Sequence, residues 1–124
     1  MERFDVIQAG FTGDAVLARA GLTHNEALVR ASALRALHRM GQLTSDDLSA
    51  CISDIDADVR RTVVELSAQF SEVEIYHLVN DTDLFVAEMT AWALDERTAI
   101  TDVEIEMLIQ QTTVDHQRNQ DQSK

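Results

Sequence analysis

Apolar residues recur along this chain at intervals of three and four positions, which is the spacing of one face of an α-helix. The clearest run lies within residues 56–70, and residues 24–40 show the same spacing. The pattern predicts three long helices that alternate with three shorter ones. Their expected ranges are 24–40, 45–53, 56–70, 72–80, 83–96 and 102–113. The predicted fold class is all-α, and the strongest predicted core positions are Val59, Val63, Leu66 and Phe70.

The predicted helices recur in a fixed order. Val29, Val59 and Val86 stand near the starts of the three long helices, at offsets of 30 and then 27 positions. Self-similarity at a period of roughly 20–50 residues is typical of repeat proteins, in which each helix pair buries its apolar face only by stacking on the next. We therefore expect one domain over residues 1–113. Its expected units are about 1–22, 23–53, 54–80 and 81–113.

Both ends of the chain depart from this pattern. Residues 1–22 resemble a degenerate first pair, in which Phe4, Ile7 and Phe11 are expected to close the end of the stack. The last short helix is expected to turn a set of aliphatic residues toward the core, namely Val103, Ile105, Leu108 and Ile109. Residues 114–124 are expected to form a disordered polar tail, because a segment this polar cannot bury enough surface to order itself.

Hydroxyl residues followed three positions later by a carboxylate mark several expected helix starts. Such a pair forms a capping box, in which the two side chains satisfy free backbone N–H groups reciprocally. The pattern predicts capping boxes at Thr23–Glu26, Ser71–Glu74 and Thr101–Glu104, with Thr44 and Asp47 in the same column. Gly41 is expected to end the helix over 24–40 in a left-handed conformation.

The stretch from Asp54 to Arg60, with the sequence Asp-Ile-Asp-Ala-Asp-Val-Arg, resembles the turn of HEAT-like repeats, in particular the short repeats of phycobilisome lyases. The resemblance spans roughly residues 13–113 and implies a right-handed α-α superhelix of three clear helix pairs. In that family the turn aspartate and the arginine after the valine form a ladder between neighbouring repeats. The resemblance therefore implies a ladder of Asp54, Asp81, Arg30 and Arg60. His24 replaces the aspartate in one repeat and Ala87 replaces the arginine in another.

The charge of the chain bears on its partners. The net charge is −12 over 124 residues, and Lys124 is the only lysine. Such a chain should be repelled by phosphate backbones, so nucleic-acid binding is not expected. One explanation of the acidity is a basic protein partner. The alternatives are that it keeps the protein soluble or that it is an adaptation to a host with high internal salt. No run of about 18 apolar residues and no signal peptide is present, so we expect a cytoplasmic protein without membrane contact.

The first candidate surface is a stripe of Phe85, Met89 and Trp92, which are neighbours on one face of a helix. In the repeat register Trp92 aligns with Glu65 and Arg35, so this face is polar in the earlier units. The stripe is either an exposed anchor for a protein partner or a second copy of the chain, or an apolar face that the C-terminal segment covers.

The second candidate surface is the face of the short helices, which lines the concave side of many HEAT-like proteins. Tyr76, His77 and Asn80 form its most recognition-like group. The alternative is an ordinary solvated face.

Catalytic, cofactor and metal sites are not predicted. Glu74 and His77 have the spacing of a di-iron motif, but the second copy of the motif is missing. Cys51 falls in a core column and is expected to behave as a small hydrophobe. The predicted function is a non-catalytic protein-interaction or scaffold module. The alternatives are an accessory protein such as a lyase-like chromophore chaperone, and a self-assembling unit such as a homodimer.

Overall fold

The computed structural model describes the backbone of residues 1–122 and the side chains of residues 1–97 and 105–110. In this part of the chain all regular structure is helical, as predicted, and no strand occurs. The elements are α1 (Arg3–Thr12), α2 (Ala15–Gly21), α3 (Ala27–Arg39), α4 (Ser45–Cys51), α5 (Ala57–Leu66), the 3-10 helices η1 (Ser67–Gln69) and η2 (Tyr76–Asn80), and α6 (Leu84–Gln122). None of these helices combines the length and the apolar character needed to cross a membrane.

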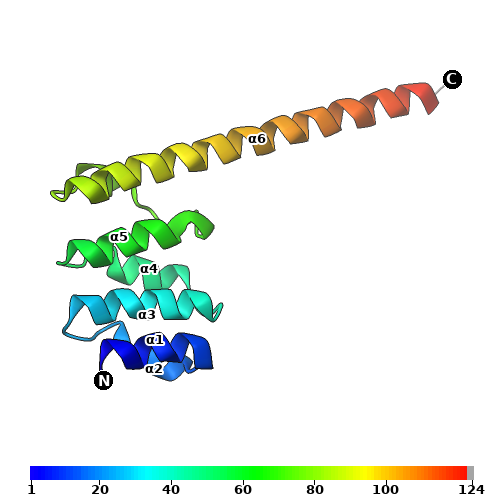
Figure 1. The fold of residues 1–124 in the computed structure, drawn as a ribbon. Helices are drawn as coiled ribbons and strands as arrows, with labels where there is room; N and C mark the ends of the chain where they lie inside the picture. Colours follow the sequence, from blue (N-terminus) through cyan, green and yellow to red (C-terminus); the bar gives the residue numbers. More distant parts are fainter. Residues whose placement is uncertain (123–124) are drawn as a thin grey trace.

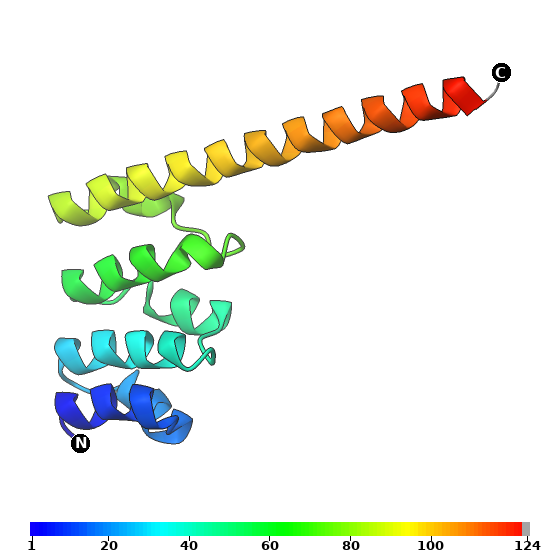
Figure 2. The ribbon, with the colours of Figure 1, turned by 45° about the vertical axis from the view of Figure 1, so that its right-hand side comes forward.

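The helices form a two-layer stack. Helices α1, α3, α5 and the first turns of α6 lie side by side in this order, and α2, α4 and η2 connect them (Figures 1 and 2). Helix α1 lies at one end of the stack and α6 at the other, and α6 continues far beyond its neighbours. The chain therefore has a packed body and one long projecting helix.

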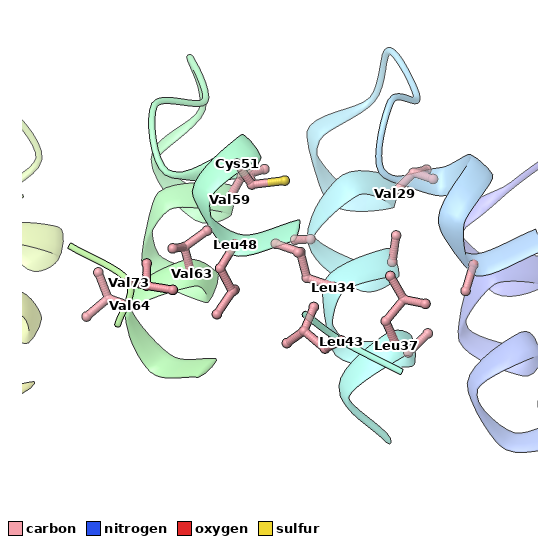
Figure 3. Packing of buried hydrophobic residues seen from close by; sticks show 14 of the residues in the cluster. Val29, Leu34, Leu37, Leu43, Leu48, Cys51, Val59, Val63, Val64 and Val73 are labelled. Atoms are coloured by element: carbon pink, nitrogen blue, oxygen red, sulfur yellow. The ribbon is translucent and has the colours of Figure 1, made fainter. Parts of the chain in front are cut away.

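Val29, Val59 and Val86 occupy equivalent places in the body. Each is the third residue of its helix, and each is fully buried. Between Val29 and Val59, side chains from α3, α4 and α5 point toward one another (Figure 3). The core is aliphatic, because the fully buried hydrophobic side chains among the described residues include no aromatic ring.

A ladder of arginine–aspartate pairs runs along the turns before the long helices. Arg30 donates two hydrogen bonds of 2.8 Å to the carboxylate of Asp54, and Arg60 donates bonds of 2.8 and 3.0 Å to Asp81. Each guanidinium also donates to a turn carbonyl, that of His24 for Arg30 and that of Asp54 for Arg60, both at 2.8 Å. The arginine of one long helix thus fixes two successive turns.

His24 takes over the local role of the missing turn aspartate. Asp54 accepts the backbone N–H of Asp56, and Asp81 accepts that of Asp83, two residues farther on. At the equivalent place Nδ1 of the His24 ring accepts the backbone N–H of Glu26 at 3.0 Å. The turn therefore keeps its shape because an imidazole nitrogen supplies the acceptor that a carboxylate supplies elsewhere.

The ladder changes the titration of both aspartates. Burial by itself raises the pKa of Asp54, but the hydrogen bonds from Arg30 and from the Asp56 backbone outweigh it, so the pKa lies below its ordinary value. The hydrogen bonds from Arg60 lower the pKa of Asp81, against the opposing effect of its burial. Both carboxylates are thus held in the charged form.

Acidification from about pH 5 to about pH 2 is expected to lower the free energy of unfolding. A carboxyl whose pKa is lower in the folded chain than in the unfolded chain, where it is about 3.9, stabilises the fold fully above that value. This stability is lost as the pH falls through the lower, folded value. Urea denaturation at a series of pH values measures how steeply the free energy of unfolding depends on pH. Asp81→Asn should flatten this dependence on pH, because it removes one of the two carboxyls whose pKa the ladder lowers. Equal slopes in the wild type and Asp81→Asn would contradict the prediction.

Two of the three expected capping boxes are not formed, namely Thr23–Glu26 before α3 and Ser71–Glu74 before η2. Helix α3 begins only at Ala27, and the Thr23 hydroxyl donates to the Ala20 carbonyl instead. The Glu74 carboxylate accepts the backbone N–H of Tyr76, and the segment forms a turn and a 3-10 helix rather than an α-helix over 72–80. The capping box of Thr44 and Asp47 is formed.

The predicted short helix over 102–113 is also wrong, because α6 is one continuous helix of 39 residues. No glycine follows Gly41 and the chain has no proline, so no residue between 84 and 122 compels the helix to end. Ile105, Leu108 and Ile109 are 50%, 66% and 60% exposed instead of buried. The side chains of Val103, Thr101 and Glu104 lie outside the described residues. Helix α6 also includes residues 114–122 of the expected tail.

The first pair, α1 and α2, is fully helical, and its aromatic residues do not close the stack as expected. Phe4 and Phe11 are each 68% exposed, and Ile7 is also exposed. Helix α1 contacts α3 through a small residue instead, because a Cβ on Gly10 would lie only 3.0 Å from the Cα of Ala36. The aromatic stripe of α1 therefore faces outward.

Candidate interaction surfaces

Trp92 lies over an open groove between α5 and α6. Its side chain is 65% exposed, and Met89, one turn earlier, is half-buried beside it. The groove has a volume of about 180 Å³ and is called the Trp92 groove here. Its lining residues are Val64, Glu65, Ala68, Met89, Trp92, Ala93, Glu96 and Arg97. The floor is apolar, so this part of the predicted stripe forms a hollow with an exposed indole at its edge.

The charged groups around the groove are mainly acidic. Glu96 lines it together with Arg97 and with Glu65, whose charge is balanced by Arg35, and Glu88 and Asp95 are exposed one turn to either side of Trp92 on α6. Glu65 accepts a hydrogen bond of 2.6 Å from Arg35 of α3, which confirms that the predicted register brings these two positions side by side. The rim of the groove is therefore suited to an apolar group that carries positive charge nearby.

Arg97 lines the groove and links α6 to the segment after α5. Its guanidinium donates to the backbone carbonyls of Ser67 and Val73, each at 3.0 Å, and to that of Phe70 at 3.4 Å. These carbonyls belong to the segment after α5, where those of Ser67 and Phe70 also accept the backbone N–H groups of Phe70 and Val73. Arg97 could not be recognised from the sequence, because the segment that it contacts was expected to be helical.

Phe85 does not line the Trp92 groove. The guanidinium of Arg61, from α5, lies 5.1 Å from the centre of its ring, and Arg61 also pairs with Asp58. The predicted stripe is thus divided into Phe85, which is exposed with a guanidinium near its ring, and the pair Met89 and Trp92, which lines the groove.

Tyr76, His77 and Asn80 form a separate surface. All three are exposed on η2, and none of them lines the Trp92 groove. Because η2 is a 3-10 helix, with three residues per turn, His77 and Asn80 share an edge while Tyr76 points to a different side. The structure therefore brings two of the three residues together.

The Cys51 side chain belongs to the core, as predicted. It is buried, and this burial raises the pKa of its thiol, with the nearby charges of Asp54 and Asp47 acting in the same direction. Among the described residues no three or more His, Cys, Asp or Glu side chains are grouped so as to hold a metal ion. Cys51 and His77 lie on different elements, one buried and one exposed.

Comparison of the chain with protein-family models, with curated proteins and with solved structures finds no match. The function therefore has to be argued from the chemistry of these surfaces.

Proposed function

We propose that the chain is a non-catalytic protein-interaction module, and that a partner protein binds in the Trp92 groove. The observation that carries this proposal is the exposed indole of Trp92 above an apolar hollow. Tryptophan is among the residues that contribute most to protein–protein affinity, and such residues act by filling or flanking desolvated pockets. Apolar patches that are rimmed by polar residues mark interaction sites, and the apolar lining of this groove is flanked by Glu65, Glu96 and Arg97.

The size of the groove suits side chains better than a cofactor. Its volume of about 180 Å³ is smaller than the roughly 300–1,000 Å³ of typical small-molecule sites. A cavity of about 150 Å³ accommodates one benzene-sized group. The Trp92 groove is thus matched to one or two large apolar side chains of a partner.

The proposed architecture is a HEAT-like solenoid, a right-handed superhelix that serves as a scaffold. The equivalent positions of Val29, Val59 and Val86 support it, as does the ladder that ties successive turns. In this architecture each long helix adds one strip to a continuous outer face, and the Trp92 groove is the last strip of that face.

Affinity capture from native lysate tests the proposal with three variants. Trp92→Ala is expected to lose the partner that the wild type retains, because truncating an interface tryptophan typically costs about 2 kcal/mol or more, which is about 30-fold in affinity. Tyr76→Ala is expected to retain the partner, since it changes the short-helix face instead. Val16→Ala, at an exposed position of α2, is the matched control.

Thermal melts should show that Trp92→Ala folds normally, because the indole contributes little to the core. Retention of every captured protein by Trp92→Ala would exclude the groove as the binding site. Loss in Tyr76→Ala alone would assign binding to the short-helix face instead.

A further inference from the structure

The outer side of α1 and α3 is basic, although the chain as a whole carries a charge of −12. A second groove of about 160 Å³ lies there and is called the α1–α3 groove here. Its lining residues are Arg3, Ile7, Phe11, Ser32, Arg35, Ala36 and Arg39. Three of these seven residues are arginines and none is acidic. The charged side chains of this groove are therefore positive, whereas those around the Trp92 groove are mainly negative.

The arginine head groups are fixed at the rim of the α1–α3 groove. The guanidinium of Arg39 lies 4.1 Å from the centre of the exposed Phe11 ring, and Nε of Arg3 donates to the Ser32 hydroxyl at 3.1 Å. Both of these contacts are to neutral groups, so they leave the positive charge in place. Arg35 differs, because its charge is balanced by Glu65. The groove is therefore lined by two exposed apolar side chains, Ile7 and Phe11, beside the cationic side chains of Arg3 and Arg39.

The projecting part of α6 has the opposite character. Ile105, Met107, Leu108 and Ile109 are all at least half exposed there. Residues 98–117 contain no lysine or arginine, and their acidic residues are Asp102, Glu104, Glu106 and Asp115. This segment is an apolar and acidic helix, which complements the α1–α3 groove in both respects and is repelled by the acidic rim of the Trp92 groove.

We propose that the projecting part of α6 from one copy of the chain docks in the α1–α3 groove of a second copy. The groove of the same copy is out of reach, because α1 and α6 lie at opposite ends of the stack and α6 extends away from it (Figures 1 and 2). Each copy then offers one helix and one groove, so the contact is head-to-tail. Such contacts build rings when the rotation closes and open chains when it does not.

Sedimentation velocity of the full chain at low salt tests this arrangement. The wild type is expected to sediment above its monomer mass of 13.8 kDa as its concentration rises. Added salt should reduce the association, because Arg3 and Arg39 contact carboxylates at an exposed interface. Leu108→Glu places a negative charge on the apolar surface of the docking helix. Arg39→Glu reverses the charge of one side chain at the groove. Each variant alone should therefore be monomeric. Val16→Glu, at an exposed apolar position of α2, should associate like the wild type.

A mixture of the two monomeric variants is the decisive measurement. Leu108→Glu retains an intact groove and Arg39→Glu retains an intact helix, so equal amounts should form a heterodimer through the one remaining contact. Thermal melts confirm that both variants fold, and Phe11→Glu replaces Arg39→Glu if the latter does not.

Three outcomes would overturn the proposal. The first is a wild type that stays monomeric up to about 1 mM, a concentration that corresponds to only about 4 kcal/mol of binding free energy. The second is a mixture of the two monomeric variants that fails to associate, or an Arg39→Glu variant that associates like the wild type, which would indicate that two α6 helices pair with each other. The third is a Trp92→Ala variant that loses self-association, which would place the contact at the Trp92 groove.

Discussion

Replacement of Arg60 with alanine is expected to lower the free energy of unfolding by about 3–5 kcal/mol, because it leaves a buried carboxylate without its partner. The side chains of Arg60 and Asp81 are only 13% and 6% exposed, so water cannot replace the lost hydrogen bonds. The carbonyl of Asp54 also loses a donor. Urea denaturation followed by circular dichroism measures the change.

Arg35→Ala is the matched control for this prediction. Arg35 also pairs with a carboxylate on the next long helix, but its side chain is 52% exposed and that of Glu65 is 37% exposed. Exposed pairs of this kind contribute about 0–1 kcal/mol. If the two variants unfold at the same urea concentration, the ladder contributes no more than a surface ion pair and the prediction is wrong.

Leu34→Ala is expected to destabilise the chain by about 2–5 kcal/mol, through lost burial and the cavity that remains. Leu34 is fully buried among side chains of α3 and its neighbours. Natural domains of this size have a total stability of about 5–15 kcal/mol, so the loss is a large fraction of the whole. The denaturation midpoint should fall while the dependence on urea concentration stays the same.

Leu66→Ala provides the comparison. Sequence analysis placed Leu66 among the strongest core positions, but in the structure it is the last residue of α5 and only half-buried. We expect its truncation to cost clearly less than that of Leu34, because part of the side chain already contacts water. A loss at Leu66 equal to that at Leu34 would contradict this ranking.

Several features of the site followed from sequence because they depend on local spacing. Trp92 and Met89 were identified because apolar residues stand where the other units have polar ones, and the Arg35–Glu65 contact confirms that alignment. The groove itself could not be predicted, since Val64 and Ala68 reach it from α5 and η1. The contact between Arg61 and the Phe85 ring could not be predicted either, because Arg61 approaches it from another helix.

The arginine–aspartate ladder was predicted in part from local residues and in part from the family resemblance. Asp54 and Asp81 accept turn N–H groups two residues onward, which is a local property of aspartate in turns. The resemblance to HEAT-like repeats added the pairing with Arg30 and Arg60, which the structure contains. The role of His24, whose ring nitrogen supplies the same acceptor, was not predicted.

By itself the sequence determined that the chain is helical, which faces of α3 and α5 are buried and where the turns before the long helices lie. Those properties depend on apolar spacing and on acceptors within a few residues, so they are set by neighbours along the chain. Only the tertiary structure decided how the last third is arranged. No glycine or proline follows Gly41, yet the chain leaves the helix after α5 and continues through α6 without a break. Arg97 stabilises the segment after α5, because its guanidinium donates to the carbonyls of Ser67, Phe70 and Val73, which lie 24 to 30 positions earlier in the chain. A contact between residues this far apart in sequence is decided by the tertiary arrangement of α5 and α6.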